Sequence, residues 1–184
     1  MQIIVKPVSA ANRADFSVLQ CEKNGLGWCN CVAWWVPSWH GFGDRTAQQN
    51  LDLRNQLFDQ GEYDGYLLYL DGTVVGWCQC GPRDRLKKLV SQYGLTPAPD
   101  IWAITCFALA PDIRGKGLAH ALMVSVVADL SSRGVKYVQG FPRIGAGLDS
   151  EEVWTGTESI FHSANFLLER AHEKFPIYGL KLGK

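Results

Sequence analysis

One segment constrains the fold of this chain more than any other: an apolar stretch that runs into a glycine-containing loop and then a helical repeat. The stretch Ile101–Leu109 carries apolar residues on both faces, which predicts a buried central strand. Ala110-Pro111-Asp112 then turns the chain. Apolar residues recur every four positions between Leu118 and Leu130, which predicts a helix from about Gly117 to Arg133, ended by Gly134.

The loop between this strand and this helix reads Arg114-Gly115-Lys116-Gly117. The first amides of a helix have no partner within the helix and carry a partial positive charge. Glycine lets an anion approach the backbone closely, and the two basic side chains add formal charge. The loop therefore predicts a site for a phosphate or pyrophosphate. The P-loop spacing is absent, and a dinucleotide fingerprint fails because position 120 is His and a hairpin precedes the segment.

The remaining pattern predicts a mixture of strands and helices in one domain, residues 1–184. Asp71-Gly72 predicts a two-residue hairpin turn, and Thr46 with Gln49 has the spacing of a capping box. We expect an α+β (mixed α/β) fold with a mostly antiparallel central sheet, one parallel strand–helix–strand crossover and flanking helices. The expected strands are 3–5, 66–70, 73–80, 101–109, 135–141, 166–169 and 178–182, and the expected helices are 11–21, 46–60, 83–93, 117–133 and 157–164.

Composition excludes some classes of function. Eighteen basic and eighteen acidic residues cancel, so the chain lacks the overall field that draws proteins to nucleic acid or anionic membranes. No apolar run approaches the ~20 residues that span a bilayer, and the first residues do not resemble a signal peptide. We therefore expect a cytoplasmic protein whose six cysteines are thiols or metal ligands rather than disulfides.

The loop and its surroundings closely resemble the acyl-CoA-binding motif of the GNAT superfamily of N-acetyltransferases. That motif is Gln or Arg, two residues, Gly, one residue, then Gly or Ala, here Arg114, Gly117 and Ala119. The preceding strand with Pro-Asp, the following helix and the closing segment 161–166 extend the resemblance over roughly residues 63–183. It implies a GNAT-like fold and an acyl-CoA-dependent N-acyltransferase, most simply one that transfers acetyl from acetyl-CoA to a small-molecule or peptide amine. The sequence leaves monomer or homodimer open.

The resemblance also implies how acetyl-CoA is held as cosubstrate, with no metal required. The pantetheine arm lies beside the strand backbone at Phe107, Ala108 and Leu109, and an amide near Phe107 polarises the thioester carbonyl. The acceptor amine attacks directly, after losing a proton, because an alkylamine has a pKa of about 10.4. The residues expected around the pyrophosphate are Arg114, Gly115, Lys116, Gly117, Leu118, Ala119 and His120.

Three positions depart from the family's pattern. A frequent catalytic carboxylate corresponds to Ala103, a frequent tyrosine acid to Phe161, and a cofactor-contacting Asn to Trp154. Glu158, one turn before Phe161, is the leading substitute carboxylate, although a solvated surface Glu explains it too. Tyr178 is an alternative proton donor, or a core residue of the closing strand. These losses motivate a second reading, a non-catalytic sensor of acyl-CoA.

Seven tryptophans are unusual for this length, and Trp34, Trp35 and Trp39 crowd one short stretch. In the resembling fold, the segment after the first strand covers the acceptor pocket. We expect these rings to line that pocket, or else to form a satellite core under a long loop. An aromatic pocket favours an acceptor of hydrophobic or aromatic character, or a cation held over ring faces.

Two cysteine pairs, Cys29/Cys31 and Cys78/Cys80, echo each other. If the pairs faced each other, four thiolates could bind zinc, which gives a third reading as a thiol or zinc protein. The pattern favours packing of small apolar residues, or an oxidisable pair, over zinc, because the usual C-x-x-C spacing is missing. Cys106 is adjacent to the proposed oxyanion donor, but strand alternation places it on the opposite face and favours a buried core thiol over a nucleophile.

Overall fold

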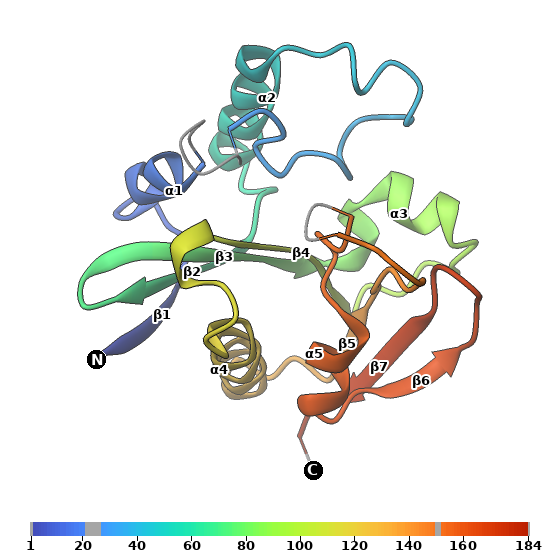
Figure 1. Cartoon of the computed structure of the whole chain (residues 1–184). Coiled ribbons are helices and arrows are strands. Elements are labelled where there is room, and N and C mark those ends of the chain that lie inside the picture. Colours follow the sequence, from blue (N-terminus) through green and yellow to red (C-terminus); the bar gives the residue numbers. More distant parts are fainter. Residues whose placement is uncertain (1, 21–26, 150–151, 184) are drawn as a thin grey trace.

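The computed structural model describes residues 2–20, 27–149 and 152–183. Within these ranges a seven-stranded sheet in the order β1-β2-β3-β4-β5-β7-β6 carries helices on both faces (Figure 1). The strands are β1 (Ile3–Pro7), β2 (Gly65–Leu70), β3 (Thr73–Pro82), β4 (Ile101–Leu109), β5 (Tyr137–Gly140), β6 (Leu167–Arg170) and β7 (Ile177–Lys181). The helices are α1 (Arg13–Leu19), α2 (Ala47–Asp59), α3 (Lys87–Gln92), α4 (Leu118–Ser132) and α5 (Glu158–Ser163), with 3₁₀ turns η2 (Arg83–Arg85) and η3 (Pro111–Ile113).

The sheet confirms the predicted topology. Neighbouring strands pair antiparallel, except that β4 and β5 run parallel, with Ile101 opposite Tyr137 and Ile104 opposite Gly140. The chain makes this parallel connection through α4, because parallel neighbours need a crossover long enough to return to the same end of the sheet.

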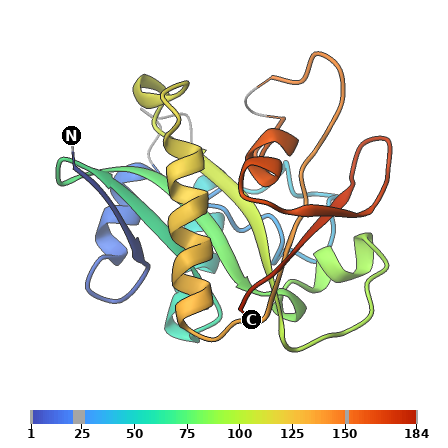
Figure 2. The same ribbon diagram turned by 90° about the horizontal axis from the view of Figure 1, so that it is seen from below.

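The helices divide between the two faces of the sheet. Figures 1 and 2 show α1 and α2 on one face and α4 and α5 on the other. The apolar side of α4 packs against the sheet, with Leu122, Met123 and Val126 buried there. On the other face Phe16 of α1 lies edge-on against Trp77 of β3, at 4.4 Å between ring centroids. A smaller core around Trp34, Leu89 and Phe141 lies toward α3.

Short-range signals in the sequence form as expected. Thr46 and Gln49 make both hydrogen bonds of a capping box at the start of α2. Asp71 and Gly72 both have positive φ, 48° and 82°, as a two-residue hairpin turn between β2 and β3 requires.

Several element boundaries differ from the prediction, and the predicted strand 135–141 shows why. It is confined to Tyr137–Gly140, because the amide of Val135 donates to the carbonyl of Leu130 in the C-terminal cap of α4 and cannot join the sheet. The predicted helix 83–93 divides into η2 and α3 at Leu86. The predicted helix 11–21 is confined to Arg13–Leu19, and its last residue, Cys21, lies outside the described residues.

Two features of β4 create the place where a ligand can meet the sheet. The register shifts so that Gln79 pairs with Cys106 while Cys80 pairs with Ile104, which leaves Thr105 as the extra residue of a bulge. Beyond Ile104, β4 continues to Leu109, whereas β5 ends at Gly140. The C-terminal half of β4 therefore has no strand partner on its β5 side.

Candidate active site

The predicted anion loop is a backbone cradle at the N-terminus of α4. Gly115 and Gly117 both have a φ of 76°, and Gly117 is the N-cap of the helix. A Cβ placed on either glycine would meet no atom within 4 Å, so the space beside both residues is open. Arg114 is oriented by its Nε, which donates to the carbonyl of Leu109 at 3.1 Å. The residues thus fit a pyrophosphate, because the two glycines leave room for it and the N-terminus of α4 supplies positive potential.

The other residues predicted around this cradle play different parts. Lys116 is exposed, while Leu118 is buried in the core and can offer only its backbone. His120 is exposed in the first turn of α4, where its Nδ1 lies 2.8 Å from the hydroxyl of Ser163 on α5. The cradle is therefore bordered by both helices on this face of the sheet.

The backbone of β4 near the bulge is engaged by a segment far along the chain. The amide of Phe107 donates to the carbonyl of Trp154 at 2.7 Å. The ring of Phe107 contacts Phe161 of α5, at 6.2 Å between centroids, and a Cβ on Gly156 would lie 3.0 Å from that ring. The segment 153–156 thus runs along the unpaired half of β4, so the amide expected to face a thioester carbonyl already has a partner.

The cysteines beside this strand are not arranged for zinc. Cys31 Sγ lies 3.4 Å from Cys106 Sγ, and both side chains are buried on the face opposite the Phe107 ring. Hydrogen bonding to Cys106 and burial raise the pKa of Cys31 well above its usual value. Throughout the described ranges no three His, Cys, Asp or Glu side chains gather as metal ligands. Cys29, Cys31, Cys78 and Cys80, all within the described ranges, are therefore not gathered into the four-thiolate arrangement that the sequence left open.

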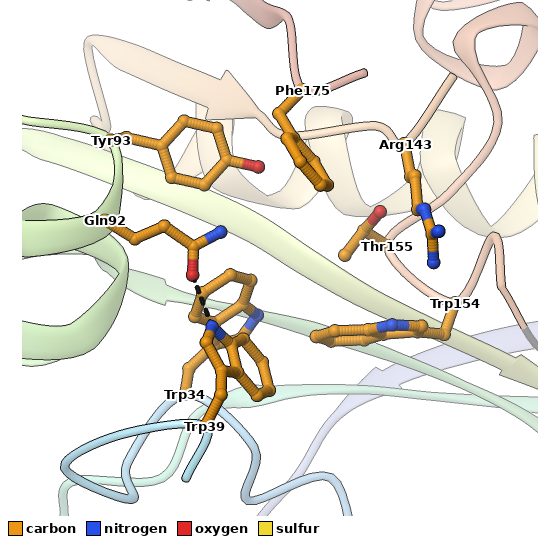
Figure 3. Close-up of a pocket in the computed structure, with 8 residues that line it drawn as sticks. All are labelled: Trp34, Trp39, Gln92, Tyr93, Arg143, Trp154, Thr155 and Phe175. Atoms are coloured by element: carbon orange, nitrogen blue, oxygen red, sulfur yellow. Dashed lines mark hydrogen bonds between the residues drawn. The ribbon is translucent and has the colours of Figure 1, made fainter. Parts of the chain in front are cut away.

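A cavity of about 240 Å³ opens beside the same segment. Figure 3 shows its walls, in which aromatic rings from four parts of the chain converge. We call it the aromatic cavity, and it is lined by Trp34, Trp39, Gln92, Tyr93, Arg143, Trp154, Thr155 and Phe175. Trp34 and Trp154 are close, at 5.6 Å between ring centroids, and the indole N–H of Trp34 donates to the carbonyl of Thr105 at 3.4 Å. The aromatic cavity therefore borders the bulge of β4.

A buried lysine lies behind one wall of the aromatic cavity. The Nζ atom of Lys88 is 3.4 Å from the ring centroid of Trp39 and 5.3 Å from that of Phe42. Nζ has no hydrogen-bond partner in the described part of the chain, and burial lowers the pKa of Lys88 from 10.5 to about 8. Trp39 is also fixed from α3, because its indole N–H donates to Gln92 Oε1 at 2.6 Å (Figure 3).

The tryptophan-rich segment is held in place by polar anchors. Arg54 of α2 is buried and donates to Asn30 Oδ1 at 2.8 Å and to Ser17 on α1 at 3.0 Å. The hydroxyl of Tyr63 donates toward the carbonyls of Asn30 and Cys31, both of which have positive φ. These contacts fix the turn that precedes Trp34 and so direct its ring onto β4.

Comparison with known proteins decides the family. A family model described as the acetyltransferase (GNAT) family matches residues 28–141, more than half of the chain. The chain belongs to this family. It is accordingly an acetyl-CoA-dependent N-acetyltransferase, and its family acetylates amine acceptors. Among curated protein sequences, none shows significant similarity to this acetyltransferase.

Solved structures share the fold of the acetyltransferase at low sequence identity. An aminoglycoside acetyltransferase in complex with coenzyme A superposes with a TM-score of 0.62 at 17% identity, covering 98% of this chain and 95% of that one. An N-acetyltransferase from Staphylococcus aureus Mu50 gives 0.57 at 12% identity and covers 100% of both chains. An N-acetyltransferase from Thermoplasma acidophilum, also with coenzyme A, gives 0.57 at 11% identity, covering 98% and 99%. These likenesses confirm the predicted fold class.

The two residues predicted for proton transfer lie together. The hydroxyl of Tyr178 donates to Glu158 and lies 3.2 Å from His162 Nε2. Burial and the hydrogen bond to Glu158 raise the pKa of Tyr178 to about 12, so it is protonated at neutral pH. The Tyr178 ring stacks on Phe161, which also contacts Phe107. Phe161 therefore links the Tyr178–Glu158 pair to Phe107 on β4.

The structure divides the three predicted acceptor tryptophans. Trp34 and Trp39 line the aromatic cavity, whereas Trp35 stacks on Tyr63 at 4.8 Å between centroids and is not among the lining residues. Sequence reasoning missed the walls supplied by Tyr93, Trp154 and Phe175. The number of tryptophans pointed to Trp154, since rings that are costly to expose must pack together or line a pocket, but no sequence pattern pointed to Tyr93 or Phe175.

None of the helices in the described ranges is long and apolar enough to cross a membrane.

Proposed function

We propose that acetyl-CoA binds with its pyrophosphate in the cradle 114–120 and its pantetheine arm beside Phe107–Leu109, and that the acceptor amine enters from the aromatic cavity. The observation that carries this proposal is that the aromatic cavity and the backbone of β4 meet at Trp154. Trp154 lines the aromatic cavity with its ring, and its carbonyl accepts from the Phe107 amide on β4. An amine in the aromatic cavity is thereby brought to the strand along which the thioester lies.

Acetyl-CoA supplies an acetyl group activated as a thioester. The Phe107 amide stabilises the negative charge that develops on the carbonyl oxygen during attack, as an oxyanion-hole donor does. In this arrangement the thioester oxygen lies beside the Trp154 carbonyl, and the two oxygens share the Phe107 amide when acetyl-CoA binds.

Arg114, Lys116 and the amides at the start of α4 hold the pyrophosphate by charge and by hydrogen bonds. This part of the proposal is supported by the open space at Gly115 and Gly117 and by the orientation of Arg114 against Leu109. Strong binding remote from the acetyl group serves the reaction because it fixes the thioester against β4.

Glu158 and Tyr178 are the candidates for proton transfer. Tyr178 is the proton donor for the departing thiolate, and Glu158 orients its hydroxyl. The support is the hydrogen bond between them together with the absence of a hydroxyl at Phe161 and of a carboxylate at Ala103.

The test is a charge reversal in the cradle. Arg114→Glu places a negative charge beside the pyrophosphate, so the Kd for coenzyme A should rise at least tenfold, with the thermal unfolding midpoint nearly unchanged. Lys181→Glu, an equal change of charge at an exposed position on β7, is the matched control and should leave the Kd within about twofold. Calorimetric titration with coenzyme A measures both. Equal affinity of the Arg114→Glu variant and the wild type would contradict the placement of the pyrophosphate.

A further inference from the structure

We infer that the acceptor is an aromatic amine whose nitrogen is bonded directly to a ring and that reaches the thioester from the aromatic cavity. This inference rests on the proposed function, since it names the substrate class of the same site. It depends on the shape of the aromatic cavity, on its charges and on what the reacting nitrogen needs there.

The walls of the aromatic cavity suit a flat apolar ring. Trp34, Trp39 and Trp154 lie with ring centroids 5.3 to 6.4 Å apart, and Tyr93 and Phe175 close the opposite side (Figure 3). Rings packed on rings gain stability beyond the area they bury, in edge-on or offset arrangements. A volume of about 240 Å³ accommodates a single substituted ring rather than a long peptide.

The charges around the aromatic cavity disfavour a cationic amine. Among its described lining residues there is no carboxylate, and the one fixed charge is the guanidinium of Arg143, 3.2 Å from Glu152. Aromatic faces attract cations, but two of the lining rings already have one: the Lys88 ammonium lies 3.4 Å from the Trp39 centroid, and the Arg170 guanidinium lies 6.0 Å from the Tyr93 centroid. An incoming ammonium would find like charges and no counter-ion within the lining.

The reacting nitrogen must therefore arrive unprotonated. An alkylamine with a pKa of about 10.4 is unprotonated in only about one molecule in a thousand near neutral pH. An amine on an aromatic ring delocalises its lone pair into the ring and is neutral at that pH. Such an acceptor needs no base to remove a proton before attack, which agrees with the buried alanine at Ala103.

The step balances without any further reactant. The lone pair of the amine nitrogen forms a bond to the thioester carbonyl carbon, and the carbon–sulfur bond breaks. The nitrogen, made acidic by forming the new bond, loses one proton, and the departing thiolate gains one, so the products are an N-aryl acetamide and the free thiol of coenzyme A.

One polar group in the wall is placed to recognise the nitrogen. Thr155 is 5% exposed, and its Oγ1 is buried without a hydrogen-bond partner among the described residues. It follows Trp154, the residue whose carbonyl accepts from the Phe107 amide. A buried hydroxyl without a partner is costly, so an N–H group that it can accept from would be favoured at this point.

The experiment compares aniline with benzylamine, which differ by one methylene and by the protonation state of the nitrogen. Release of the coenzyme A thiol is followed with acetyl-CoA between pH 6 and pH 9. We expect kcat/KM for aniline to exceed that for benzylamine at least tenfold at pH 7, and to change little with pH. A preference for benzylamine, or aniline turnover no faster than in buffer alone while coenzyme A binds, would overturn the inference.

Two matched tryptophan variants test whether aniline binds in the aromatic cavity. Trp39 and Trp28 are 43% and 42% exposed, each donates one indole hydrogen bond, and each contacts Phe42. Only Trp39 lines the aromatic cavity. Trp39→Ala should raise KM for aniline about tenfold while KM for acetyl-CoA stays unchanged, and Trp28→Ala should change neither. Equal KM values for aniline in both variants would refute the assignment of the aromatic cavity.

Failure of the inference and failure of the proposed function give different results. If coenzyme A binds, and an alkylamine is acetylated in preference to aniline, only the acceptor class is refuted. If coenzyme A does not bind in calorimetry, the cradle itself is refuted.

Discussion

A methyl group added at Gly117 tests the cradle with a control built into the same helix. Gly117 is the N-cap of α4, with a φ of 76°, and Gly134 follows its C-cap, with a φ of 81°. A Cβ at either position would meet no atom within 4 Å. Alanine in the left-handed conformation costs roughly 1–2 kcal/mol, so the two variants should lose similar stability. For a chain of this size, about 1 kcal/mol corresponds to a fall in Tm of roughly 2–4 °C.

The two variants should differ in coenzyme A affinity. The methyl group of Gly117→Ala projects into the open space beside the first amides of α4, where the proposed pyrophosphate lies. We expect Kd to rise at least tenfold, or about 1.4 kcal/mol of binding free energy. Gly134→Ala, at the opposite end of the helix, should bind coenzyme A within about twofold of the wild type.

Differential scanning calorimetry gives the stability change, and isothermal titration gives the affinity. Unchanged affinity in Gly117→Ala would refute close backbone contact at this residue. Similar losses of affinity in both variants would show that destabilisation of α4, and not contact with the ligand, weakens binding.

Three further changes have distinct expected outcomes. Thr46→Ala removes one half of the capping box of α2 and should lower the free energy of unfolding by about 1 kcal/mol, in denaturant titrations, with kcat/KM unchanged; no loss of stability would show that the cap contributes nothing. Burial lowers the pKa of Lys88 from 10.5 to about 8, so the charged lysine destabilises the native state below pH 8, and this penalty fades as pH rises toward 10.5. Lys88→Met should therefore have a free energy of unfolding about 1 kcal/mol above that of the wild type at pH 7, after allowing for the lost cation–π attraction. The difference should shrink by pH 10. A destabilised variant at pH 7 would mean that the cation–π attraction outweighs the cost of burying the charge. Tyr178→Phe should lower kcat at least tenfold with KM for acetyl-CoA unchanged, if the hydroxyl protonates the thiolate, and a normal kcat would remove Tyr178 from the proposed mechanism.

Features that depend on a few consecutive residues could be predicted from the sequence. The capping box at Thr46 and the hairpin turn at Asp71-Gly72 form as expected, because each depends on backbone conformations that neighbouring residues dictate. The strand Ile101–Leu109 and the helix of the cradle also form, because their apolar patterns repeat with the period of each element.

Contacts between distant segments could not be predicted in this way. The Trp154 carbonyl on the Phe107 amide joins residues 47 positions apart in the sequence, and no local pattern records it. The contact of Cys31 with Cys106, rather than with the second cysteine pair, likewise depends on how the segment around Asn30 is anchored by Arg54.

By itself the sequence determined the fold class, the cradle at the start of α4 and the family, because backbone conformation and helix-end electrostatics follow from neighbouring residues. Only the tertiary structure decided which tryptophans share a cavity and which groups lie beside the C-terminal half of β4. Those contacts arise where separate elements pack against β4, and the free energy of packing depends on side chains that the linear order leaves far apart.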